Sequence, residues 1–132
     1  MSVEPHAQLR ERRPATPDSI QPLRRAVVEL AAARGASQDQ LENIALAVSE
    51  AVSNAVMHAY VEEERPGTVA VEALVRDDAL DVAVCDEGRG LLPREDSPGL
   101  GWGLALIDRI AEQLRLDESG PGVRLQMRFR IR

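Results

Sequence analysis

The chain has 132 residues, 44% of them hydrophobic and 29% charged, which predicts one globular domain over residues 1–132. Its formal net charge of −6 at pH 7 argues against direct nucleic-acid binding, and its single cysteine and two histidines exclude an internal disulfide and disfavour a structural zinc site. Because the sequence shows no secretory signal and no apolar run near eighteen residues, we expect a soluble, cytoplasmic protein with no membrane partner.

The first third of the chain predicts one helix after an irregular start. Residues 1–14 predict either a flexible terminus or an edge strand around residues 7–12. Thr16 offers a capping hydroxyl, while Pro22 removes one helical hydrogen bond, so we expect a regular helix over residues 19–34. Gly35 then supplies the left-handed position that ends many helices.

The segment 41–60 predicts the central helix of the domain, opened by a capping box at Ser37 and Gln40. Glu50, Asn54 and His58 stand four residues apart, so a helix places each about one turn above the last. The opposite side of the helix is apolar. This polar ladder is either a solvated helix face or part of a functional site, and the absence of Lys and Arg between residues 41 and 60 favours the second interpretation.

Two alternating strands follow, over residues 68–76 and 80–86, joined by a tight turn at Asp77-Asp78. In the second strand Asp86 shares a face with Leu80, Val82 and Val84. A carboxylate on the apolar side of a sheet must be hydrogen-bonded, or it costs several kcal/mol in desolvation.

The C-terminal part predicts a glycine-rich segment, a helix over 104–114 and one or two strands, the last over 123–132. The order of elements predicts an α+β two-layer sandwich, an α/β domain in the broad sense. Its mostly antiparallel, mixed sheet is expected to carry the helices on one face.

Two glycine-containing motifs lie between the second strand and the last helix. In Asp86-x-Gly88-x-Gly90, the carboxylate can accept a hydrogen bond from an exocyclic amine, although it is equally a common strand-ending acid. In the segment 99–104, Gly99, Gly101 and Gly103 precede Leu104, and free N–H groups at a helix start favour a phosphate. Alone, such a segment is often only a turn, and neither a dinucleotide fingerprint nor a P-loop fits.

Together, these motifs resemble the Bergerat-fold ATP-binding superfamily of gyrase B, Hsp90, histidine kinases and MutL. Glu50-x-x-x-Asn54 is similar to its N box, and the two glycine segments are similar to its two glycine boxes. The residues that match the N box of the stand-alone anti-sigma-factor serine kinases are Ser49, Glu50, Ala51, Asn54, Ala55, His58 and Tyr60.

This resemblance implies a site for ATP and Mg²⁺ between the helices and the sheet. Glu50 would be the catalytic base, Asn54 the Mg²⁺ ligand, and Asp86 the acceptor for the adenine amine. The glycine boxes would surround the nucleotide, with N–H groups offered to the phosphates by the second box. The expected nucleotide-binding residues are Asn54, Asp86, Gly88, Gly90, Gly99, Gly101, Trp102, Gly103 and Leu104.

The function implied is an ATP-dependent serine/threonine kinase that acts as an anti-sigma factor. It would phosphorylate a STAS-domain anti-sigma antagonist, sequester a sigma factor and form a homodimer. The chain departs from the family pattern in its short connector, residues 91–98, and in Trp102 inside the second glycine box. The short connector keeps open a non-catalytic, ATP-sensing regulatory module. A histidine-kinase catalytic domain ranks lower, because the sequence has no helical hairpin with a phosphoacceptor histidine.

Overall fold

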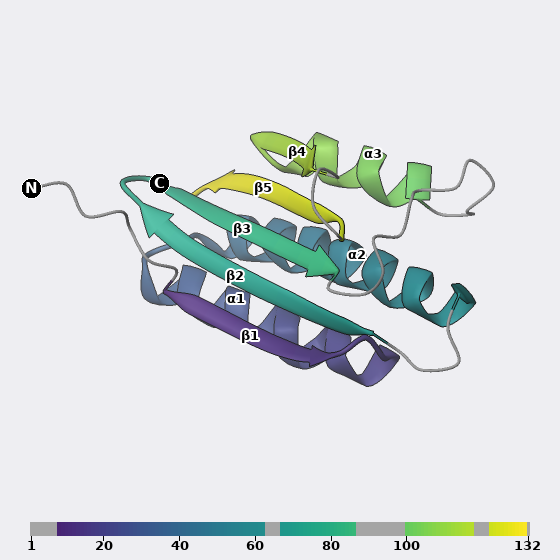
Figure 1. Cartoon of the computed structure of the whole chain (residues 1–132). Helices are drawn as coiled ribbons and strands as arrows, with labels where there is room; N and C mark the ends of the chain where they lie inside the picture. Colours follow the sequence, from purple (N-terminus) through teal and green to yellow (C-terminus); the bar gives the residue numbers. More distant parts are fainter. Residues whose placement is uncertain (1–7, 63–66, 87–99, 118–121, 132) are drawn as a thin grey trace, which may run out of the picture.

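The computed structural model describes residues 8–62, 67–86, 100–117 and 122–131, with only the backbone described for residues 58–62 and 100–103. Three α-helices lie on one face of a five-stranded sheet (Figure 1). The elements in chain order are β1 Leu9–Pro14, a short 3-10 turn Pro17–Ser19, α1 Ile20–Ala33, α2 Gln38–Glu62, β2 Thr68–Arg76, β3 Ala79–Asp86, α3 Leu100–Ile110, β4 Gln113–Asp117 and β5 Arg124–Arg130. None of the helices described is long and apolar enough to cross a membrane.

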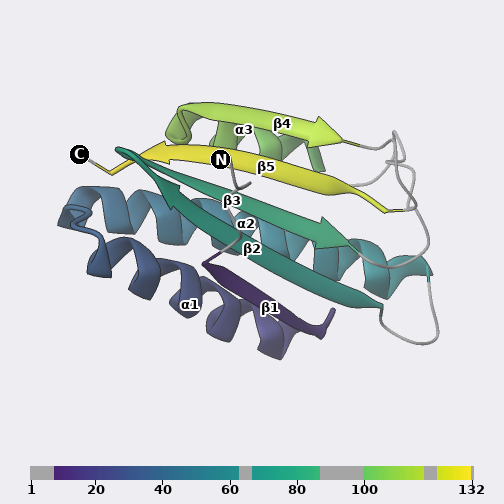
Figure 2. The same ribbon diagram turned by 60° about the vertical axis from the view of Figure 1, so that its left-hand side comes forward.

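The sheet has the strand order β1-β2-β3-β5-β4, and all four pairings among the described strands are antiparallel. Figure 2 shows all three helices on the same side of the sheet, with α3 behind β4 and β5. No helix or strand of the described residues covers the other face, which we call the open face. This confirms the predicted two-layer fold. β1 forms the predicted edge strand, although it ends at Pro14 rather than near residue 12.

Alternation of side chains explains why one sheet face is covered. In β5, Leu125, Met127 and Phe129 are buried, whereas the residues between them are partly or fully exposed. In β2 and β3 alternate residues also join the core beneath the sheet, namely Val69, Val71, Ala73, Leu80, Val82 and Val84. Ala70 and Ala83 are buried as well, but they lie outside this core. The predicted turn between them is confirmed at Asp77, whose φ of 55° is a left-handed conformation that Asp tolerates.

The start of α1 differs from the prediction in its capping. Thr16 makes no side-chain hydrogen bond to the helix backbone. Instead, the buried Ser19 hydroxyl donates to the Pro14 carbonyl at 2.7 Å and joins the turn to β1. Pro22 is tolerated because it is the third residue of α1, where the backbone N–H would have no partner within the helix.

The end of α1 confirms the expected role of Gly35. Its φ is 93°, and its N–H donates to the Ala32 carbonyl at 3.2 Å. The next N–H, from Ala36, donates back to Ala31 at 3.1 Å. These two bonds form the helix-ending motif that a left-handed glycine allows.

The capping box that opens α2 is confirmed, and it predicts a measurable stability effect. The Gln40 N–H donates to the Ser37 hydroxyl at 3.2 Å, and the Ser37 N–H donates to the Gln40 side-chain oxygen at 2.8 Å. Ser37→Ala is expected to lower the free energy of unfolding by about 1 kcal/mol, because one N–H loses its acceptor. Urea denaturation would measure this. Gln38→Ala, which leaves the box intact, should cost much less; equal losses would contradict the assignment.

The prediction for the third helix was wrong at both ends. The helix covers Leu100–Ile110 rather than 104–114. It begins earlier because Gly101 and Gly103 lie in the first turn, where glycine destabilises a helix less than in its interior. It ends earlier because Leu114 pairs with Met127 in the sheet, where the Glu112 N–H already donates to the Arg128 carbonyl at 2.7 Å.

Candidate nucleotide-binding site

Helix α2 lies in the middle of the helical layer, with α1 on one side and α3 on the other. Its buried face holds Ile44, Val48, Val52 and Val56, and the alanines Ala47 and Ala51 are buried too. Leu46 and Met57 remain 44% and 48% exposed. The polar ladder therefore stands between a packed face and an exposed one.

Within the ladder, Glu50 and Asn54 are half-buried. The Nδ2 atom of Asn54 is buried and has no hydrogen-bond partner among the described residues. Leaving a buried donor unsatisfied costs about 1–3 kcal/mol, so an acceptor atom brought by a ligand would stabilise this position. The side chain of His58 lies outside the described residues.

Asp86 is the last residue of β3, and its side chain is only 7% exposed. Its N–H donates to the Val123 carbonyl at 2.9 Å, which joins the end of β3 to the start of β5. The register pairs it with Val69 on the helix-covered side of the sheet. The expectation that this carboxylate lies on the apolar side is confirmed.

The second glycine box is only partly described. Gly88, Gly90 and Gly99 lie outside the described residues, and so does the connector 91–98. Gly101, Trp102 and Gly103 lie in the first turn of α3, while Leu104 is its fifth residue and packs against the core. A regular helix bonds the N–H of its fifth residue to the carbonyl of its first. Gly101 and Trp102, whose N–H groups are left free, are therefore better phosphate donors than Leu104.

The three segments converge at one end of the molecule. Figures 1 and 2 both show the carboxyl end of β3, the start of α3 and the C-terminal half of α2 toward the same side. A buried carboxylate, an unsatisfied amide and a helix N-terminus are thereby collected at one edge of the two layers. These groups suit, in turn, an exocyclic amine, an acceptor oxygen such as that of a phosphate, and an anion.

The donor set at this end fits Mg²⁺ bound together with a nucleotide. No group of three or more His, Cys, Asp or Glu side chains that could hold a metal occurs in the described part of the chain, so a metal here would depend on few protein ligands. Mg²⁺ commonly takes one or two protein oxygens and completes its shell with phosphates and water. The Asn54 amide can present either its nitrogen or, turned over, its oxygen, since the two are assigned from the hydrogen-bond network.

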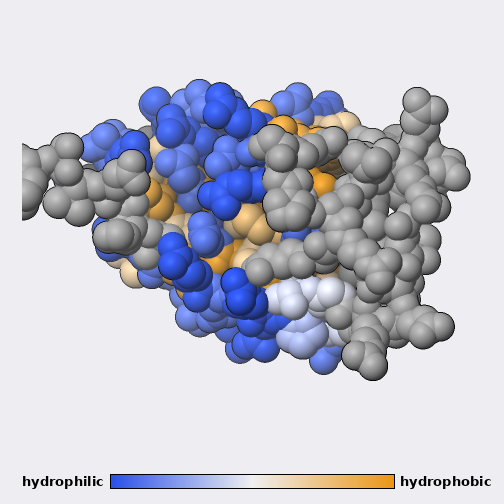
Figure 3. Space-filling view, in the orientation of Figure 1, coloured by the Kyte–Doolittle hydropathy of each residue, from blue (hydrophilic) through white to orange (hydrophobic). Residues whose placement is uncertain are grey.

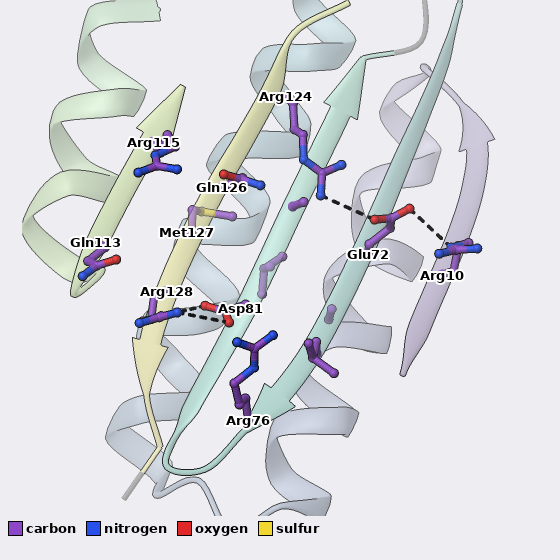
Figure 4. Close-up of a pocket in the computed structure, with 14 residues that line it drawn as sticks. Arg10, Glu72, Arg76, Asp81, Gln113, Arg115, Arg124, Gln126, Met127 and Arg128 are labelled. Atoms are coloured by element: carbon purple, nitrogen blue, oxygen red, sulfur yellow. Dashed lines mark hydrogen bonds and ion pairs between the residues drawn. The ribbon is translucent and has the colours of Figure 1, made fainter. Parts of the chain in front are cut away.

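Sequence reasoning missed one site-sized feature, on the other face of the sheet. The outward alternation of Arg124, Arg128 and Arg130 was visible in the last strand, but their cross-strand neighbours were not. Only the register of four neighbouring strands, β1, β2, β3 and β5, brings Arg10, Glu72 and Arg124 together (Figure 4).

The fold is a two-layer α+β domain with this polar end between the helices and the sheet. The model of the histidine kinase-like ATPase domain matches residues 13–129, and the chain belongs to that family.

Named relatives and a solved structure agree with this. The chain is 40% identical over 75 residues to the serine-protein kinase RsbW of Bacillus subtilis, a match covering 57% of this chain and 46% of that protein. It is 28% identical over 102 residues to the anti-sigma F factor of Clostridium acetobutylicum, covering 68% and 70% of the two chains. The crystal structure of the RsbU and RsbW domains of Rv1364c from Mycobacterium tuberculosis superposes with a TM-score of 0.73 at 26% identity, over 93% of this chain and 31% of that one. The chain spans about half the length of curated kinases such as the Bacillus subtilis protein.

Proposed function

We propose that this chain is an ATP-dependent serine/threonine protein kinase that acts as an anti-sigma factor. The observation that carries the proposal is the buried, unpartnered Nδ2 of Asn54, on the helix that lies beside the start of α3. Membership in a family of ATPase domains supports ATP as the ligand, and the names of the matched relatives support protein phosphorylation and sigma-factor control.

The proposed roles follow from the position of each residue. Asp86 accepts a hydrogen bond from the exocyclic amine of adenine. The N–H groups of Gly101 and Trp102 bind phosphate oxygens at the positive end of α3. Asn54 holds Mg²⁺, which neutralises charge on the phosphates when it is bound. Gly88, Gly90 and Gly99 are proposed to surround the nucleotide, with Gly103 and Leu104 continuing the second glycine box.

Glu50 is the proposed general base. The hydroxyl of a Ser or Thr attacks the γ-phosphorus, the bond from that phosphorus to the β–γ bridging oxygen breaks, and the hydroxyl proton passes to the Glu50 carboxylate. ADP leaves with the displaced oxygen. Phosphoryl transfer needs mainly positioning and charge stabilisation, which an open site facing a docked partner can supply.

The proposed partners are a STAS-domain anti-sigma antagonist, which receives the phosphate, and a sigma factor, which the chain sequesters. The proposed working state is a homodimer in the cytoplasm. Phosphorylation of the antagonist would weaken its hold on the chain and leave the sigma factor bound.

A transfer assay tests the proposal. The purified chain is incubated with a STAS-domain antagonist and MgATP labelled on the γ-phosphate, and label on the antagonist is measured over time. Transfer to a Ser or Thr is expected. ATP-induced thermal stabilisation without transfer to any antagonist would support the alternative, a non-catalytic ATP-sensing module. Neither transfer nor stabilisation would contradict both.

A further inference from the structure

The open face of the sheet carries a groove of about 650 Å³. Figure 3 views this face and shows hydrophilic residues gathered over the sheet around a more apolar strip. The groove crosses all five strands, and it lies on the opposite side of the sheet from the helices (Figure 4). Its charged and amide side chains are Arg10, Glu72, Arg76, Asp81, Gln113, Arg115, Arg124, Gln126 and Arg128.

The groove exists because one short side chain on β3 lies between long side chains on the neighbouring strands. Ala83 lies at its centre on β3, only 6% exposed although it points away from the core. Its cross-strand neighbours are Glu72 on β2 and Gln126 on β5, which are much longer. The long side chains form walls, and the alanine leaves a floor between them.

Both acids in the groove already have arginine partners. Glu72 lies between Arg10, at 3.3 Å, and Arg124, at 3.6 Å. Asp81 accepts hydrogen bonds from Arg128 at 2.8 and 3.5 Å, and this pairing raises the pKa of the Arg128 guanidinium. The two acids therefore hold three of the arginines in place and neutralise only part of the positive charge of the groove.

Two more arginines, Arg76 and Arg115, have no ion-pair partner in the described parts of the chain, and both are exposed. Five arginines against two acids give the groove a net charge of +3. The chain as a whole carries −6. A concentrated positive surface on an acidic protein is a specific feature and attracts negative partners.

We propose that this groove binds an acidic polypeptide segment of a partner protein. Free guanidinium groups bind carboxylates through two parallel hydrogen bonds. Arg76 on β2 and Arg115 on β4 are separated by three strand spacings across the sheet and by four residues along the strands. With ordinary sheet spacings, their Cα atoms are roughly 20 Å apart. An extended segment of about six residues spans that distance, so two of its acidic side chains reach both arginines. A single phosphate group can contact only one of the two arginines.

The groove is also separate from the proposed nucleotide site. Asp86 and the helices lie on the covered side of the sheet, whereas the groove residues of β3, Asp81 and Ala83, lie on the open side. A second copy placed face to face on the groove would oppose two surfaces of charge +3, which disfavours self-association there.

The test uses the full chain and a fluorescent peptide of about twelve residues rich in Glu, with anisotropy read at low and at physiological salt. A Gln-for-Glu peptide serves as the ligand control. The double variant Arg76→Gln/Arg115→Gln should weaken binding of the acidic peptide about tenfold. The matched control Arg25→Gln/Arg109→Gln removes the same charge from exposed positions on α1 and α3, and it should change affinity by less than about twofold. ATP-induced stabilisation should be the same in all three proteins.

Several results would overturn the proposal. Equal weakening in both double variants would show that only net charge matters. Binding of inorganic polyphosphate that depends on Arg76 and Arg115, without binding of the acidic peptide, would assign the groove to a phosphate ligand. Dissociation of a dimer in the groove variant, seen by sedimentation velocity, would assign the face to a second copy. None of these results depends on whether the chain transfers phosphate.

Discussion

Glu50→Gln is expected to lower the rate of phosphoryl transfer to a STAS-domain antagonist by about 10²- to 10⁴-fold. The amide keeps the size of the carboxylate and its half-buried position on α2, but it cannot accept the proton of the attacking hydroxyl. ATP affinity should stay near the value of the unmodified chain. Single-turnover transfer and calorimetric titration of nucleotide would measure the two quantities separately.

Glu42→Gln is the matched control for this result. Glu42 is exposed on the same helix, two turns earlier, so the substitution makes the same charge change away from the site. It should leave transfer within about twofold, as an exposed charge contributes little. If Glu50→Gln transferred phosphate as fast as the control, Glu50 would not be the base.

Asn54→Ala is expected to weaken the binding of MgATP without lowering the stability of the ligand-free protein. It should remove most of the thermal stabilisation by MgATP, which amounts to about 2.7 kcal/mol for the unmodified chain at a hundredfold excess over Kd. The ligand-free protein should become as stable as before, or more stable by about 0.5 kcal/mol. The reason is that the substitution removes an unpartnered buried donor and introduces a better helix former.

The comparison for this experiment is Asn43→Ala. Asn43 is exposed near the start of α2, so it gains the same helix propensity but should keep the full response to MgATP. Differential scanning calorimetry with and without nucleotide gives both readouts. A marked destabilisation of ligand-free Asn54→Ala would show that the amide supports the fold, and would remove the main argument for its role in the site.

The elements that sequence predicted best are those whose signal is local. The hairpin of β2 and β3 was predicted from alternation on both sides of Asp77-Asp78, and the structure confirms that both residues connect the strands. The capping box at Ser37 and the glycine at the end of α1 are equally local, since the first is complete within four residues and the second within six. Short-range patterns of this kind need no knowledge of the partner elements.

The ends of α3 could not be predicted because they depend on distant residues. The segment Gln113–Asp117 has only five residues, and its leucines fit a helix as well as a strand. Pairing with β5 decides the outcome, since Leu114 and Leu116 lie opposite Met127 and Leu125.

In the candidate site too, local patterns predicted some features, whereas others depend on residues far apart in the chain. The residue types and spacing on α2 indicated a functional ladder, and the alternation of β3 indicated that Asp86 faces the core, which the structure confirms. The lack of a partner for Nδ2 of Asn54 among the described residues could not be inferred, because it depends on every side chain that packs around it. The arginine groove was hidden for a similar reason, since its members come from all five strands.

The strand β3 belongs to both proposed surfaces at once. Its side chains alternate between Asp86, buried on the helical side, and Asp81, hydrogen-bonded to Arg128 on the open side. A shift of β3 by one residue against its neighbours would exchange the two sets, burying charge in the core and exposing valines. Both surfaces therefore depend on the same pairing register of β3. An insertion of one residue within β3 should abolish both together, whereas substitutions can alter either one alone.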